Sequence, residues 1–152
     1  MATEKSSYKI GIVSTIDYVK NVATAIGWNG IKDDKSRKLL SDLKRDLTEW
    51  NDLPFKKVAE RLYEYKGMCY DFVFIDCREP DEIDRYVKEY NAITLLINRD
   101  EVNRKYGNIS DDNVDNYLYD FVVDNNGTLQ DLEDSMHTFF SALHKIKFEK
   151  NL

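Results

Sequence analysis

The residues best placed for chemistry are an acidic and a basic side chain that follow an apolar run. The run is Phe72–Ile75 (FVFI), and Asp76 and Arg78 come just after it. Its β-branched and aromatic residues are typical of a strand buried in a parallel sheet. In open α/β sheets, ligands bind beyond the carboxyl ends of the strands. Asp76 and Arg78 are therefore candidates to bind a small ligand that carries hydrogen-bond donors and phosphate charge, although they could instead pair with each other.

The rest of the chain alternates between patterns typical of strands and of helices. Further strands are predicted at Tyr8–Ser14, Ala92–Ile97 and Phe121–Val123. Apolar residues at helical spacing predict helices at Asp17–Ile26, 35–50, Pro54–Tyr65, Pro80–Asn91 and from Thr128 to about Ile146. This alternation predicts a three-layer α/β fold, with a mostly parallel sheet of about four strands flanked by helices. We expect residues 1–152 to form a single domain.

The segment Asp100–Asp120 has no clear periodicity. It is polar, and it is too long for an ordinary connection in a compact domain. By length alone it is a candidate lid or binding loop, inserted between the last two predicted strands.

Composition excludes several classes of protein. Hydrophobic residues make up 42% of the chain, which is typical of a globular protein, and a formal net charge of -6 opposes non-specific binding to nucleic acid or to anionic membranes. We find no membrane span and no signal peptide in the sequence, so we expect a cytoplasmic protein. Cys69 and Cys77 have no metal-ligand spacing and are interpreted as reduced structural thiols. No metal site and no catalytic triad is predicted.

A glycine-rich phosphate loop would be the decisive motif for a nucleotide enzyme. None of the six glycines lies in a G-x-x-x-x-G-K-[ST] or G-x-G-x-x-G context. The 152 residues therefore contain no recognisable cradle for the phosphates of a donor nucleotide.

Five segments nevertheless resemble, in order, the deoxynucleoside monophosphate kinases of phages and their bacterial relatives. They are STIDYVKNVA (Ser14–Ala23), SRKLLSDLK (Ser36–Lys44), FVFIDCREPDEI (Phe72–Ile83), LLINR (Leu95–Arg99) and VVDNNGTLQDL (Val122–Leu132). In that family a phosphate-loop strand and helix precede the equivalent of Ile10–Ser14, and here Met1–Ser7 stands in their place. The resemblance thus implies a nucleotide-kinase-like protein that binds a (deoxy)nucleoside monophosphate but is inactive, or depends on a missing segment. ATP and Mg²⁺ are expected only if a phosphate loop is supplied.

The resemblance implies an acceptor-nucleotide site made of four residues. Asp17 lies at a helix start, Arg37 would bind the phosphate, and Asp76 and Arg78 would lie around the base and the sugar phosphate. A guanidinium suits phosphate oxygens, and a carboxylate accepts from base or sugar donors. The alternatives are that Asp17 is an N-cap and that Arg37 is a solvated charge in a first helical turn.

The resemblance also implies a lid and a donor-base loop. Arg99 and Arg104 would close over the transferred phosphate, and Asn125, Asn126 and Gly127 would lie beside the donor base. Both groups have ordinary alternatives, a surface loop for the arginines and a turn before a capping threonine for Asn125–Gly127.

Two other functions remain open. The protein could be an active kinase whose phosphate-loop segment is absent from this sequence, or a regulatory or phage inhibitor protein that keeps only the scaffold and acts through protein contacts. A missing central strand would leave a gap in the sheet, which either direct pairing of the neighbouring strands or a homodimer or protein partner would fill.

Overall fold

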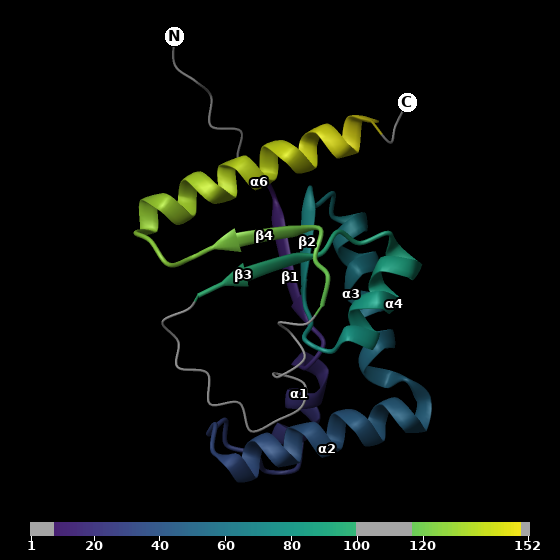
Figure 1. Cartoon of the computed structure of the whole chain (residues 1–152). Helices are drawn as coiled ribbons and strands as arrows, with labels where there is room; N and C mark the ends of the chain where they lie inside the picture. The colour runs from purple at the N-terminus through teal and green to yellow at the C-terminus, as the bar shows by residue number, and fades with distance from the viewer. Residues whose placement is uncertain (1–7, 100–116, 150–152) are drawn as a thin grey trace. The chain divides into compact units, whose positions relative to one another are not determined.

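The described part of the chain divides into two compact units. A computed structural model describes residues 8–99 and 117–149 (Figure 1). The first unit ends at Cys77 and the second begins at Arg78. Each unit contains a parallel pair of strands together with helices.

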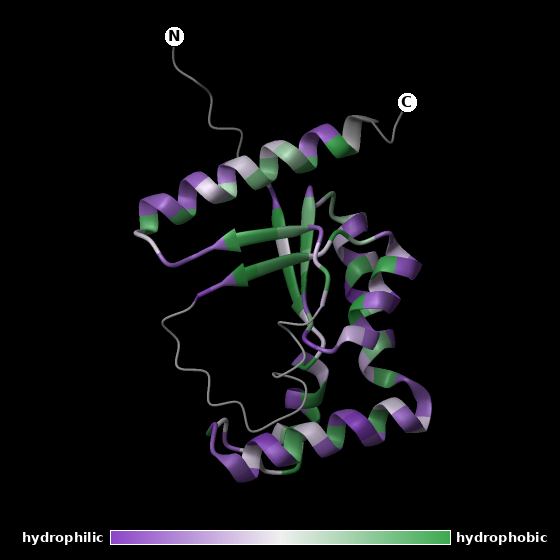
Figure 2. Ribbon diagram, in the orientation of Figure 1, coloured by the Kyte–Doolittle hydropathy of each residue, from purple (hydrophilic) through white to green (hydrophobic). Residues whose placement is uncertain are grey.

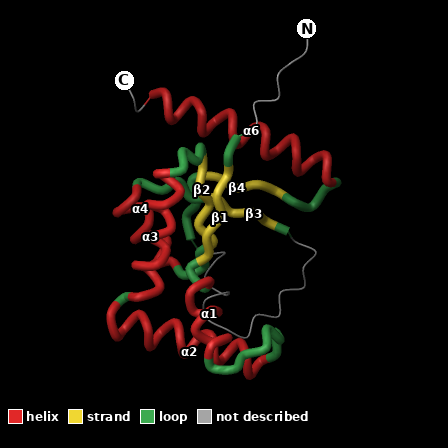
Figure 3. The backbone as a smooth tube through the Cα atoms, turned by 180° about the vertical axis from the view of Figure 1, so that it is seen from behind, coloured by secondary structure: helices red, strands yellow, loops and turns green. Residues whose placement is uncertain are grey.

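In the first unit, three helices connect two neighbouring parallel strands. The elements are β1 (Ile10–Ser14), α1 (Asp17–Ala25), α2 (Asp34–Asn51), α3 (Leu53–Gly67) and β2 (Phe72–Asp76). β1 and β2 lie side by side in parallel, with Ile10 opposite Phe72 and Ser14 opposite Asp76 (Figure 3). The residues that follow each strand therefore meet at one edge of the pair.

The core of the first unit lies between β1 and the helices α1 and α3. Alternate residues of β1 are buried, as expected for a strand with one face against a core. The helices contribute residues at helical spacing, and the buried side chains are Val13, Val19, Ala23, Phe55, Val58 and Tyr65. The hydropathy colouring of Figure 2 shows the same concentration of apolar residues along β1 and β2.

Tyr65 of α3 fixes the position of this helix against β1. Its hydroxyl donates a hydrogen bond to the backbone oxygen of Ile12 at 2.9 Å. Its ring lies over Gly11, where a Cβ atom would come within 3.1 Å of two ring carbons. The absence of a side chain at Gly11 therefore allows the helix to approach the strand closely.

Local signals in the sequence explain the ends of the helices in this unit. Asp33 caps α2 by accepting a hydrogen bond from Ser36 N at 2.7 Å. Asp52 adopts a left-handed conformation (φ 60°) between α2 and α3, and Pro54 then occupies the first turn of α3. The predicted break around residues 51–54 is confirmed.

In the second unit, a long helix covers one face of a parallel pair. The elements are α4 (Pro80–Tyr90), β3 (Leu95–Asn98), β4 (Phe121–Asp124) and α6 (Leu129–Glu149). β3 pairs with β4 from Leu95 opposite Phe121 to Asn98 opposite Asp124. Phe121 packs edge-to-face on Phe139 of α6, with ring centres 5.2 Å apart. α6 therefore binds the strand pair through its apolar stripe (Figure 1).

A reciprocal pair of hydrogen-bonding residues joins the starts of β3 and β4. The Asp120 carboxylate accepts from Thr94 N at 2.8 Å and from Thr94 Oγ1 at 2.9 Å. Asp120 N in turn donates to Thr94 Oγ1 at 2.8 Å. These bonds fix the register of the two strands at their amino ends.

The predicted mixed α/β class with parallel strands is confirmed, and several details differ. β3 starts at Leu95 rather than Ala92, because Asn91 ends α4 in a left-handed conformation (φ 53°) and irregular backbone follows. The prediction that Phe72–Ile75 is fully buried is wrong, because these residues are only partly buried in the described structure. The strands occur as two pairs, so a single sheet of about four strands stays a prediction. Among the residues described, no helix combines the length and the apolar character that crossing a membrane requires.

Candidate functional site

The carboxyl end of the β1–β2 pair brings several polar groups together. Asp17 Oδ2 accepts a hydrogen bond from Ser14 N at 2.9 Å. Thr15 N donates to the backbone oxygen of Asp76 at 3.2 Å. These two bonds fix the turn after β1 against the end of β2, so that two predicted residues, Asp17 and Asp76, lie at the same edge. Such an edge is where parallel α/β sheets bind ligands.

Two further residues, Thr15 and Lys44, lie at this edge although no sequence pattern predicted them there. Lys44 extends from α2 and its Nζ donates to Thr15 Oγ1 at 3.4 Å in a partly buried position. Thr15 is 5% exposed. The only sequence signal was the spacing of seven between Arg37 and Lys44, which places both on one face of α2.

Asp17 is not the N-cap of α1, so that alternative is wrong. Ile16 occupies the cap position and makes no capping side-chain bond. The Asp17 side chain is 55% exposed, with Oδ1 3.8 Å from Lys20 Nζ. One of its oxygens thus orders the turn, while the carboxylate remains accessible to solvent.

Arg37 lies in the first turn of α2 and its side chain is exposed. Its backbone N–H donates to Asp33 O at 2.9 Å. Its guanidinium makes no ion pair with any other described residue. In contrast, two other cations of α2 form ion pairs with Asp42. Lys38 Nζ lies 2.8 Å and Arg45 Nη1 lies 3.2 Å from its carboxylate oxygens.

Arg78 is the first residue of the second unit, and its side chain is exposed. Asp76 belongs to the first unit. The structure therefore describes these two predicted partners in separate units, and their joint role remains a prediction.

The carboxyl end of β3–β4 brings together the other two predicted groups. Arg99 follows the last residue of β3, and Asn125 follows the last residue of β4. Asn125 N donates to Asn98 O at 2.8 Å, which continues the ladder past the strand ends. Arg99 is exposed at this edge. Arg104, its predicted companion, lies outside the described residues, as does most of the predicted lid.

The segment Asn125–Gly127 forms a compact turn. Asn126 N and Nδ2 donate to Asp124 Oδ1 at 3.0 and 2.6 Å. Gly127 lies close to Asp131, so that a Cβ atom would come within 2.6 Å of Asp131 Oδ2. The turn and the helix cap that follows account for the residue types of this segment without a ligand.

The helix cap after Gly127 is again reciprocal. Asp131 Oδ2 accepts from Thr128 N and from Thr128 Oγ1, both at 2.7 Å. These hydrogen bonds, the one from the Thr128 side chain first, lower the pKa of the Asp131 carboxyl below its usual value. Asp131 N in turn donates to Thr128 Oγ1 at 3.3 Å, so the predicted capping role of this threonine is confirmed.

The described part of the chain also contains metal-ligating residue types and cysteines. Among them, no three His, Cys, Asp or Glu side chains are grouped closely enough to hold a metal ion. Neither Cys69 nor Cys77, both within the described residues, belongs to a disulfide, and Cys69 is exposed.

Comparison of the sequence with protein-family models and with curated proteins, and of the fold with solved structures, finds no match.

Proposed function

We propose that the protein is nucleotide-kinase-like and binds a (deoxy)nucleoside monophosphate at the carboxyl end of the β1–β2 pair. The observation that carries this proposal is the meeting of Asp17, Asp76 and Lys44 at that edge. A nucleoside monophosphate needs both kinds of group. Its base and sugar carry donors for carboxylates, and its phosphate needs a cation.

Arg37 is the proposed phosphate ligand on α2. Its exposed guanidinium forms no ion pair within the described structure, so binding an anion requires no existing pair to break. A planar guanidinium can bond two phosphate oxygens at once. Arg78, the other predicted cation, enters the proposal through the resemblance of its sequence segment.

The proposal is one of binding rather than of phosphoryl transfer. Transfer depends almost entirely on positioning the phosphates and stabilising their charge, and this sequence contains no phosphate-loop motif. ATP and Mg²⁺ would become relevant if another segment or another protein supplied that loop. The resemblance further implies that β1–β2 and β3–β4 belong to one sheet of about four strands.

Titration calorimetry with deoxynucleoside monophosphates tests the proposed function. We expect at least one of the four common monophosphates to bind the wild-type protein. Arg37→Gln and Arg78→Ala should each weaken binding about tenfold or more, because each removes a charged hydrogen bond. Asp76→Asn should change the preference among bases. Arg45→Gln is the matched control, since Arg45 pairs with Asp42 and Asp46 on α2.

Two results would contradict the proposal. Wild-type protein that binds none of the monophosphates has no such site. If Arg37→Gln and Arg45→Gln weaken binding equally, binding reflects the general charge of the protein rather than a site on α2.

A further inference from the structure

One flank of helix α2 combines apolar side chains with little burial. None of the 18 residues of α2 is buried within the described structure, although the helix contacts α1 and α3. Leu39 and Leu43 are partly buried, and Trp50, which follows them at helical spacing, is 74% exposed. Tryptophan is enriched at the centres of protein interfaces, because its large ring gains much from leaving water. The C-terminal end of α2 thus presents a side chain of the kind that anchors a protein contact.

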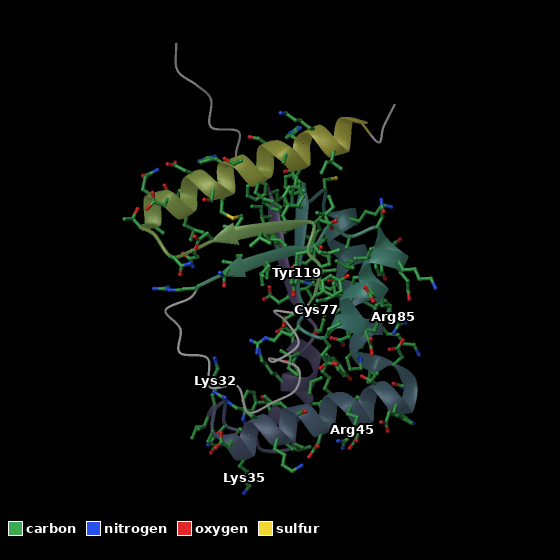
Figure 4. The ribbon with its side chains drawn as sticks, viewed as in Figure 1. Lys32, Lys35, Arg45, Cys77, Arg85 and Tyr119 are labelled. Carbon is green, nitrogen blue, oxygen red and sulfur yellow. The ribbon has the colours of Figure 1, made fainter. Side chains whose placement is uncertain are left out.

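The spacing of residues in α2 defines this flank. Side chains three or four residues apart are neighbours on the surface of a helix. The row at such spacings that ends at Trp50, here named the Trp50 flank, consists of Lys35, Leu39, Leu43, Asp46 and Trp50. Lys35 points away from the body of the first unit (Figure 4). Arg37, two residues from Lys35, lies on another side of the helix, so a contact along the Trp50 flank leaves the proposed phosphate ligand accessible.

The charges of α2 are distributed against the dipole of the helix. Near the N-terminus, the cations Lys35, Arg37 and Lys38 outnumber the acid of the first turn. The last turn contains no basic residue, and Asp46 and Glu49 lie in or next to it. A helix by itself is stabilised by the opposite distribution, with acids at its N-terminus and bases at its C-terminus. Within the described part of the chain, neither Lys35 nor Glu49 forms an ion pair. A neighbouring helix of opposite direction would supply each end with the charge that it lacks.

We propose that the Trp50 flank is the interface of a homodimer, in which the α2 helices of two copies pack antiparallel. A two-fold axis across the helix brings the same surface of both copies together, so each contact occurs twice. When the centres of the two helices coincide, Lys35 of one copy lies opposite Trp50 and beside Glu49 of the other. Lysine binds the face of a tryptophan ring through a cation–π interaction and a carboxylate through an ion pair. A parallel pair would instead place like charges side by side.

Sedimentation velocity over a series of protein concentrations tests the proposal on the full chain. We expect the wild-type protein to form a reversible dimer. Trp50→Ala should weaken dimerisation at least about tenfold, as for a tryptophan at the centre of an interface. Tyr63→Ala is the matched control, since Tyr63 is an aromatic residue of α3 that is 80% exposed, and it should leave the equilibrium unchanged. Circular dichroism verifies that both variants keep their helices.

Charge reversal tests the antiparallel orientation. Lys35→Glu and Glu49→Lys should each weaken the dimer about threefold or more, because each exposed pair occurs twice across the two-fold axis. The double variant should recover most of the loss. The net charge of -6 provides an internal control. If general repulsion between the copies governed association, Glu49→Lys would strengthen dimerisation rather than weaken it.

Three results would overturn the proposal or part of it. Wild-type protein that remains monomeric up to about 1 mM refutes the homodimer. A dimer that Trp50→Ala and Tyr63→Ala affect equally refutes the Trp50 flank as its interface. A double charge variant that recovers none of the loss refutes the antiparallel orientation.

Discussion

At the scale of single residues, short polar side chains determine where the elements of the second unit begin. Thr94 and Asp120 exchange three hydrogen bonds at the start of β3 and β4. Thr94 is 9% exposed, so these bonds are largely shielded from water. Thr128 and Asp131 repeat the arrangement at the start of α6.

Replacing Thr94 by valine should destabilise the protein by about 1–2 kcal/mol. The change keeps the side-chain volume but leaves Asp120 N and part of its carboxylate without their partner. Urea denaturation measures the difference. Thr138→Val is the control, because Thr138 is an exposed helical residue that bonds only its own helix. Equal effects of the two substitutions would show that the Thr94 pair contributes nothing specific.

The hydrogen-bonded cap of α6 should make the stability of the protein depend on pH in the acidic range. Hydrogen bonds lower the pKa of Asp131 below the usual 3.8, so the cap contributes stability above that pH and loses it as the pH falls through the lowered pKa. We expect Asp131→Asn to be less stable than wild type at pH 7, and the difference to shrink toward pH 3. Denaturation midpoints at several pH values check this. A difference that is independent of pH would contradict it.

The Tyr117 hydroxyl should ionise at a higher pH than that of an ordinary tyrosine. Burial, followed by its hydrogen bond to Asp84 at 2.7 Å, raises the pKa of Tyr117 from 10.0 to about 12. In the unfolded chain the Tyr117 hydroxyl ionises at a lower pH than in the folded protein. The stability that the protonated hydroxyl contributes is therefore present below pH 10 and is lost as the pH rises toward 12. Ultraviolet titration of tyrosinate should show a late step that Tyr117→Phe removes. If the late step persists in that variant, it belongs to another tyrosine.

At the scale of elements, the packing of α3 on β1 depends on a missing side chain. A Cβ on Gly11 would lie 3.1 Å from two carbons of the Tyr65 ring. That ring has little freedom to move, since it also packs on Tyr70 with centres 4.6 Å apart and its hydroxyl bonds Ile12 O.

We therefore expect Gly11→Ala to destabilise the protein by about 1–3 kcal/mol through overpacking. In the variant Tyr65→Leu, which has a smaller side chain at that position, the added cost of Gly11→Ala should become small. A double-mutant cycle in urea measures this coupling. Additive effects would mean that the ring is not the obstacle.

Sequence patterns predicted most of the elements but few of their contacts. Pro54, Pro80 and the apolar stripes located helices to within a few residues. The start of β3 was misplaced because Ala92-Ile93-Thr94 reads as a strand, whereas the left-handed Asn91 sends the chain into irregular backbone first. Gly11 gave no sign of its role, because the residue that it accommodates lies on a helix far along the chain.

The candidate site was likewise predicted only in part. Asp76 was predicted at the carboxyl end of a strand because it follows an apolar run, whereas Asp17 was a candidate through the resemblance of its segment. The parallel pairing of β1 with β2 brings both to one edge. The contact between Lys44 and Thr15 could not be predicted, since it depends on how α2 packs against α1 and α3. Tertiary packing of that kind is not encoded in any local pattern.

At the scale of the whole molecule, both tryptophans lie in the first unit. Trp28 and Trp50 precede the boundary at Cys77, whereas the 21-residue helix α6 belongs to the second unit. Tryptophan fluorescence therefore reports on the first unit, and circular dichroism reports on both.

If the two strand pairs form one sheet, we expect the two signals to change together in urea. A cavity in the second unit, made by Leu143→Ala, should then shift both transitions by the same amount, because one cooperative structure unfolds as a whole. Val58→Ala in the first unit is the matched comparison. Separate transitions, with Leu143→Ala moving only the dichroism signal, would contradict the single four-stranded sheet.

The connections between paired strands also bear on how the chain folds. Beside β1 and β2, the hydrogen bond from Lys9 N to the Asp71 carboxylate joins residues 62 positions apart. Beside β3 and β4, the bond from Thr94 N to the Asp120 carboxylate joins residues 26 apart. Closing a flexible loop costs only about 0.6 kcal/mol more for each doubling of its length. The difference in chain length alone therefore lowers the free-energy cost of closing the shorter connection by less than about 1 kcal/mol. The order in which the two parallel pairs assemble should depend instead on how early the helices α1, α2 and α3, which connect β1 to β2, form.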